Sequence, residues 1–150
     1  MDLLPNSLSF RVITTIDVES ESDIPEGFTG RIRLSIGGVL VYVAWFTDGL
    51  LDDPARRMPA YTRYRDNGRV KYEMHYRKGL LNDPGDGHPA VRGYFANGRV
   101  HYEERFLDGR RHDGPGGIAA IRKWRPDGSL RRALHSHYGR QIPGPHHRAG

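Results

Sequence analysis

Four glycines stand 30 residues apart in this chain. Two further columns keep the same step, one of aspartates and one of glycines. The three columns are Gly38, Gly68, Gly98 and Gly128; Asp23, Asp53, Asp83 and Asp113; and Gly49, Gly79, Gly109 and Gly139. A fixed period of this length is typical of proteins whose similar units stack in a row. The period predicts four repeat units, over residues 19–48, 49–78, 79–108 and 109–138.

Each unit carries the signature of a β-hairpin. Asn67-Gly68, Asn97-Gly98 and Asp127-Gly128 are turn dipeptides between runs of β-branched and aromatic residues, and Gly37-Gly38 splits two apolar runs in the first unit. Both residues of such dipeptides tolerate a left-handed backbone, so we expect tight turns there. In the second unit the predicted strands are 60–65 and 69–76. The segments between hairpins, 50–58, 80–88 and 110–118, are expected to be loops.

The predicted fold is all-β, an elongated antiparallel sheet of stacked β-hairpins with about nine strands. Residues 1–150 form a single repeat domain in this interpretation. Leu8–Val18 alternates like a strand and caps the first unit within segment 1–18, and segment 139–150 is expected to be a flexible tail. Arg132 and Ser136 replace the aromatic residues of earlier units, so we expect the fourth unit to fray or to be covered.

Composition limits the class of protein. Apolar residues make up 37% and charged residues 27% of the chain, which suits a thin structure with a small core. No apolar run approaches the roughly 18 residues that cross a bilayer, and residues 1–10 do not resemble a secretory signal. The absence of cysteine excludes disulfides and thiol chemistry. These features favour a cytoplasmic protein without a membrane span.

The net charge of +5 is distributed unevenly. Residues 1–48 hold 3 Arg and 7 acidic residues (−4), residues 49–108 hold 11 basic and 9 acidic residues (+2), and residues 109–150 hold 9 basic and 2 acidic residues (+7). If the units stack in order, the molecule has an acidic and a basic end. Such a field can steer a charged partner.

Three clusters could carry chemistry, and each has a simpler explanation. The aspartate column could bind Ca²⁺, but turn capping is favoured because each loop offers few oxygens. His135 and His137, with His146 and His147, could bind zinc, but no further ligand is apparent, and a surface pair is favoured. Glu73, Glu103 and Glu104 could act as paired catalytic carboxylates. Cross-strand pairing with arginines such as Arg63, Arg65, Arg92 and Arg99 is favoured instead. We therefore predict no catalytic, cofactor or metal site and no enzyme.

Interleaved tyrosines and arginines form the strongest candidate surface. These residue types are enriched in protein interfaces, although aromatic residues in stacked units also pack the sheet. The predicted partner-binding residues are Tyr61, Arg63, Tyr64, Arg65, Arg92, Tyr94, Arg122 and Trp124.

Segments 64–79 and 94–109 share an ordered pattern of an aromatic residue, Asn-Gly, Tyr-Glu, a second aromatic residue and Gly. Segment 124–139 matches it without Tyr-Glu. The pattern resembles the MORN-type repeat in its bacterial variant form, over residues 30–139. This resemblance implies an antiparallel β-structure that serves as a binding platform, and some bacterial variants are antitoxin-like.

The sequence therefore predicts a non-catalytic protein-binding module, a bacterial or phage regulator or inhibitor acting on a protein with an acidic surface. The alternative is a nucleic-acid-associated protein that uses its basic C-terminal end, residues 110–140. The acidic first third opposes a uniform phosphate track and makes this alternative the weaker one.

Overall fold

The computed structural model describes residues 13–137 and 140–142. Within them the protein is all-β, and its only helices are the 3-10 turns Glu21–Asp23 and Pro115–Gly117. The main sheet runs β1-β2-β3-β5-β6-β9-β10-β13-β14-β15, with β4 paired to β3. Its strands are β1 Thr15–Val18, β2 Gly30–Ile36, β3 Val39–Thr47, β4 Leu50–Leu51, β5 Tyr61–Tyr64, β6 Val70–Met74, β9 Val91–Tyr94, β10 Val100–Glu104, β13 Ile121–Trp124, β14 Leu130–His137 and β15 Arg140–Ile142.

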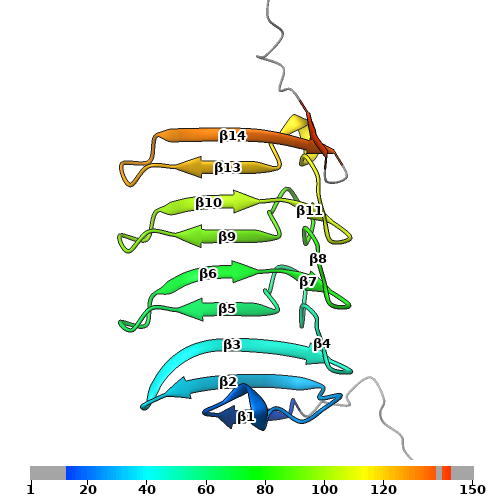
Figure 1. The fold of residues 1–150 in the computed structure, drawn as a ribbon, viewed down its shortest axis with the longest axis vertical. Helices are drawn as coiled ribbons and strands as arrows, with labels where there is room; N and C mark the ends of the chain where they lie inside the picture. Colours follow the sequence, from blue (N-terminus) through cyan, green and yellow to red (C-terminus); the bar gives the residue numbers. More distant parts are fainter. Residues whose placement is uncertain (1–12, 138–139, 143–150) are drawn as a thin grey trace, which may run out of the picture.

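Successive hairpins lie one above another along the longest axis of the molecule (Figure 1). Neighbouring hairpins join through three antiparallel residue pairs, for example between β6 and β9 and between β10 and β13. The sheet is open, with β1 at one end and β14 and β15 at the other. We call each hairpin with its following loop a rung.

The Asn-Gly and Asp-Gly turns form as expected, but their backbone differs from the prediction. Gly68, Gly98 and Gly128 are left-handed, whereas the Asn or Asp before each is not. The Gly68 N–H donates to the Arg65 carbonyl, and the Asn67 side chain accepts from the Arg69 N–H. Each turn is thus a three-residue loop. Just beyond it, one residue of the second strand has no partner, Lys71 in β6 and Arg131 in β14, and the register of the hairpin shifts there. Among the turns of the four long hairpins, only Gly37-Gly38 has two left-handed residues.

The predicted loops after each hairpin contain further strands, so this part of the prediction is wrong. β7 Tyr76–Arg77 pairs with β8 Leu80–Leu81, and β11 Phe106–Leu107 pairs with β12 Arg110–Arg111. The turns of these small hairpins, and of β3–β4, have two left-handed residues: Asp48-Gly49, Lys78-Gly79 and Asp108-Gly109. The small hairpins therefore use the tight turn that we expected at Asn-Gly.

The two ends of the sheet also correct the prediction. β1 pairs with β2 in parallel, because the segment between them crosses back before β2 begins. Residues 8–12 of the predicted capping strand lie outside the described residues. Residues 140–142 of the predicted flexible tail form β15, which pairs with His135–His137. Part of the fourth unit is thus covered, and the rest of the tail lies outside the described residues.

The recurrent aspartate ties three segments together at each of the three junctions between rungs. One oxygen of Asp83 accepts from the Ala90 N–H at 2.8 Å and the Phe106 N–H at 3.0 Å. Asp53 and Asp113 make the same two bonds, to residues 7 and 23 positions later. Their second oxygen binds Nδ1 of His75 at 2.7 Å and of His135 at 2.6 Å. The column serves as a backbone clamp, and no described cluster could hold a metal ion.

The side chains of the main sheet alternate between two faces. One, the tyrosine face, carries Tyr42, Tyr72 and Tyr102 in one row with Arg63 and Gly93, and Tyr61 in the neighbouring row. The Tyr42 and Tyr61 ring centroids are 4.8 Å apart, and those of Tyr61 and Tyr72 are 5.9 Å apart. In the first unit this face packs into the core, with Ile32, Leu34 and Ala44 buried beside Val18 and Phe28. Ala60, Ala90 and Ala120 are fully buried farther along the sheet.

We expect Asp83→Ala to lower the free energy of unfolding by about 2–4 kcal/mol, since two part-buried N–H groups lose their acceptor at roughly 1–3 kcal/mol each. Asp83→Asn keeps an acceptor oxygen and should lose less. Urea unfolding of both variants, with the exposed turn variant Asp66→Ala as control, measures the effect. Equal stability of Asp83→Ala and Asp66→Ala would contradict the clamp.

Gly93 makes room for a ring of the tyrosine face. A Cβ atom at Gly93 would lie 2.2 Å from the Tyr102 ring, which is too close for any contact. We expect Gly93→Ala to destabilise the protein by about 1–3 kcal/mol through overpacking. In a Tyr102→Ala background the same change should cost much less, and a double-mutant cycle of thermal unfolding measures this coupling. Additive effects would show that Tyr102 does not limit residue 93.

Candidate functional site

The face opposite the tyrosines carries a row of charged residues, which we call the ionic face. Register along the sheet aligns Thr62, Glu73, Arg92, Glu103 and Arg122. Since alternate residues of a strand share a side, Tyr64, Tyr94 and Trp124 lie on this face as well. Hydrogen bonding supports this placement, because the Tyr94 hydroxyl donates to Glu73 at 2.6 Å.

Three arginines surround one buried carboxylate on the ionic face. Glu103 accepts from Nε and Nη2 of Arg92 at 2.9 and 2.7 Å, and from Nη2 of Arg122 at 2.7 Å. Arg105 is almost fully buried, with Nη2 3.9 Å from Glu103 and Nη1 3.9 Å from Asp83. We call Arg92, Arg105 and Arg122 the arginine cluster. Three guanidinium groups against two carboxylates leave it a net charge of +1.

The arginine cluster keeps unused hydrogen-bonding capacity at the surface. The side chains of Arg92 and Arg122 are 30% and 31% exposed, whereas Glu103 is 6% exposed. A guanidinium has five N–H donors, and Glu103 takes two from Arg92 and one from Arg122. Planar donor groups of this kind suit a second carboxylate or a phosphate.

Aromatic rings flank the arginine cluster. The guanidinium carbon of Arg122 lies 5.1 Å from the centre of the Trp124 ring, a cation–π contact. His101 stacks on Phe95 with ring centroids 4.0 Å apart. Burial, followed by the nearby charges of Lys123, Arg131 and Arg65, holds the pKa of His101 below its usual value.

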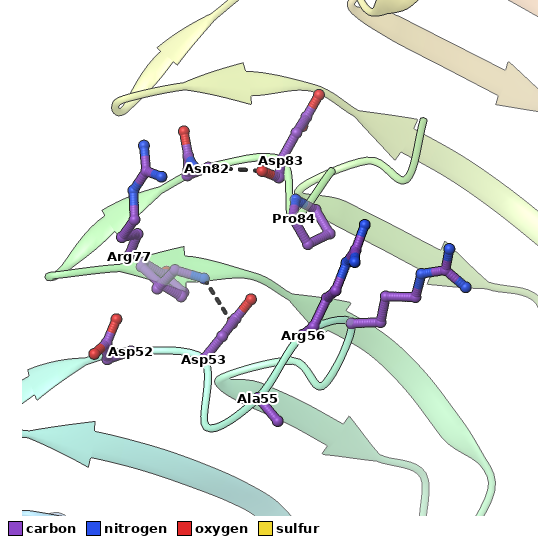
Figure 2. A pocket seen from close by; sticks show the side chains of 10 residues that line it. Asp52, Asp53, Ala55, Arg56, Arg77, Asn82, Asp83 and Pro84 are labelled. Carbon is purple, nitrogen blue, oxygen red and sulfur yellow. Dashed lines mark hydrogen bonds between the residues drawn. The ribbon is translucent and has the colours of Figure 1, made fainter. Parts of the chain in front are cut away.

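Two hollows lie between the loops of neighbouring rungs. The larger, of about 310 Å³, lies between Asp52–Arg57 and Asn82–Pro84 (Figure 2). Its charged groups serve the fold: Arg56 and Arg57 bind Asp86 at 2.6 and 2.8 Å, and Arg77 binds Asp108. The smaller, of about 180 Å³, reaches the ionic face and is lined by Arg57, Glu73, His75, His88, Pro89 and Arg92. It adjoins the arginine cluster through Arg92 and offers mainly cationic or N–H groups.

The predicted partner-binding residues separate between the two faces. Tyr64, Arg92, Tyr94, Arg122 and Trp124 lie on the ionic face. Tyr61 and Arg63 lie on the tyrosine face, because they alternate with Thr62 and Tyr64 along β5. Arg65 stands at the hairpin turn, where its Nη2 donates to the Tyr94 carbonyl at 2.9 Å. A single surface made of all eight residues is therefore not formed.

The carboxylates of the hydrolase hypothesis are occupied by other contacts. Glu103 is bound by Arg92 and Arg122, and Glu104 by Arg111. Glu73 pairs with the Tyr94 hydroxyl, not with Arg63 or Arg65 as predicted. His135 is held by Asp113 and only 11% exposed, so it is not the surface residue that we expected. The His137 ring packs 4.7 Å from that of His112.

The predicted cross-strand pairing of Glu103 with Arg92 is confirmed. Sequence reasoning missed the contribution of Arg105 to this site. No signal in the sequence pointed to Arg105, because its burial depends on the bend after β10. Comparisons with protein-family models, with curated proteins and with solved structures found no match to this chain.

Burial, with the hydrogen bond to Glu73, raises the pKa of Tyr94 to about 12. Because the folded state holds this proton more tightly than the unfolded state, its contribution to stability is complete below pH of about 10 and is lost towards pH 12. Tyr94→Phe should remove this pH-dependent contribution to stability. The wild-type minus variant difference in tyrosinate absorbance should have a midpoint near 12, and a midpoint near 10 would contradict the buried hydrogen bond.

Proposed function

We propose that this chain is a non-catalytic protein-binding repeat module, whose ionic face binds an acidic surface on another protein. The arginine cluster carries this proposal, because it presents the partly exposed side chains of Arg92 and Arg122 beside Tyr94 and Trp124. Arginine and aromatic residues in such proximity are typical of binding hot spots. The small hollow beside Arg92 offers space for one acidic side chain.

The resemblance to bacterial MORN-type repeats supports a platform that works by direct contact. It favours a bacterial or phage regulator or inhibitor, antitoxin-like in its action, in the cytoplasm. In the described part of the chain no helix is long and apolar enough to cross a membrane. A role without catalysis also accords with Glu103 and Glu104, whose carboxylates are bound by arginines.

Arg92→Gln combined with Arg122→Gln tests this proposal, because glutamine keeps an N–H donor for Glu103 but removes two positive charges. We expect the amount of protein captured from cells of the source organism to fall at least about tenfold relative to wild type, as for hot-spot residues. Arg56→Gln with Arg77→Gln removes two arginines from the larger hollow and should leave capture unchanged. Quantitative mass spectrometry provides the readout, and circular dichroism checks the fold.

A further variant, Trp124→Ser, leaves the contacts of Glu103 intact and should also weaken capture. No captured protein, or equal capture by all variants, would overturn the proposal. Binding of a single-stranded oligothymidine that weakens steeply between about 50 and 200 mM salt would instead support the nucleic-acid alternative.

A further inference from the structure

The main sheet ends in an incompletely paired strand on its basic side. β14 pairs with β13 along one edge, and along the other with β15 only at His135–His137. Among the described residues, no strand pairs with the second edge of Leu130–Leu134. An uncovered strand edge can pair with another chain, and proteins usually protect such edges.

The uncovered part of β14 corresponds to the surface by which each rung joins the next. In β6 the joining residues are Tyr72, Glu73 and Met74, which pair with β9. In β10 they are 102–104, which pair with β13. Thirty residues later, the same positions in β14 are Arg132, Ala133 and Leu134. This edge therefore has the form of a rung whose next neighbour is missing.

The opposite end of the sheet is also open. β1 has one partner in the sheet, β2, and no described strand covers its other edge. Each end presents an exposed apolar side chain: Ile13 is 58% exposed just before β1, and Leu130 is 52% exposed at the start of β14. Apolar contact can therefore accompany backbone pairing at both ends.

The two ends carry opposite charge. Described residues 13–48 hold six acidic residues and two arginines, a balance of −4, and residues 109–137 with 140–142 hold eight basic and two acidic residues, a balance of +6. These regions lie at opposite extremes of the long axis (Figure 1). The exposed charges near the ends include Glu19, Asp23 and Glu26, and Arg131 and Arg132. Two like ends repel each other, whereas unlike ends attract.

We propose that two copies of this chain associate head to tail, with the β14 edge of one copy against the β1 end of the next. The contact joins different surfaces, so it does not close on itself and can extend into a row of molecules. Like charges disfavour the symmetric contacts of β14 with β14 and of β1 with β1. The association uses the sheet edges and is independent of the ionic face.

Analytical ultracentrifugation of the full chain over about a hundredfold range of concentration tests this association. We expect the average mass to rise with concentration beyond that of a dimer, and to fall as salt shortens the screening length below about 10 Å. Arg131→Glu with Arg132→Glu should weaken the rise, because it lowers the balance at the basic end from +6 to +2. Glu19→Lys with Glu26→Lys should weaken it by making the acidic end more basic.

A mixture of the two end variants provides the decisive measurement. The mixture restores one wild-type contact, between the basic end of the Glu→Lys variant and the acidic end of the Arg→Glu variant, so its association should exceed that of either variant alone. Lys71→Glu with Lys78→Glu gives the same change in net charge at the second rung and should associate like wild type. A monomer at every concentration, a mass that stops at a dimer, or no recovery in the mixture would overturn the proposal. Loss of partner capture by variants of the ionic face would not affect the proposed head-to-tail association.

Discussion

The aspartate clamp is the interaction on which the rest of the structure depends. One carboxylate oxygen of Asp53, Asp83 or Asp113 accepts the N–H that begins the next hairpin and the N–H that follows its bend. Without this acceptor, two backbone donors at each bend would be buried without partners, which is costly. The clamp fixes where the chain leaves the main sheet, and so fixes the stacking distance and register of the rungs.

The second oxygen of the clamp explains how a repetitive scaffold acquires a distinct site. In two rungs it binds a histidine, His75 or His135, beside the sheet. In the rung between them the equivalent residue is Arg105, which donates to the Gly87 carbonyl at 2.7 Å and lies 3.9 Å from both Asp83 and Glu103. Arg105 thus adds a third guanidinium to the pair formed by Arg92 and Arg122. One substitution in a structural column concentrates positive charge on the ionic face.

The same regularity accounts for the open ends. A stack of rungs buries backbone groups only between neighbours, so among the described residues its first and last strands are incompletely paired. β15 covers the last three residues of β14, and the segment around Phe28 supplies apolar contacts to the first unit. The charge gradient along the chain then distinguishes the two ends from each other. The ionic face lies between them, so partner binding and association of copies can be separated by mutation.

Much of the fold was predictable because glycine and aspartate act locally. Gly68, Gly98 and Gly128 turn the chain whatever surrounds them, and the alternation around them predicts strands. The Asp-Gly pairs at 48–49 and 108–109 carried the signal for the small hairpins, but the segments that follow them, 50–58 and 110–118, were assigned to loops. The parallel pairing of β1 and the course of residues 140–142 were not predictable, because both depend on contacts with distant strands.

The amino-acid sequence by itself determined the period, the all-β class, the hairpin turns and the separation of charge, since each follows from residue type and spacing. Tertiary structure decided which side chains meet. In the last three hairpins one unpaired residue of the second strand, Lys71, His101 or Arg131, follows the three-residue loop and sets the register of the remaining pairs. A shift of one residue moves a side chain to the opposite face. For that reason Tyr61 and Arg63 are separated from Arg92 and Arg122, and Glu103 becomes the buried centre of three arginines.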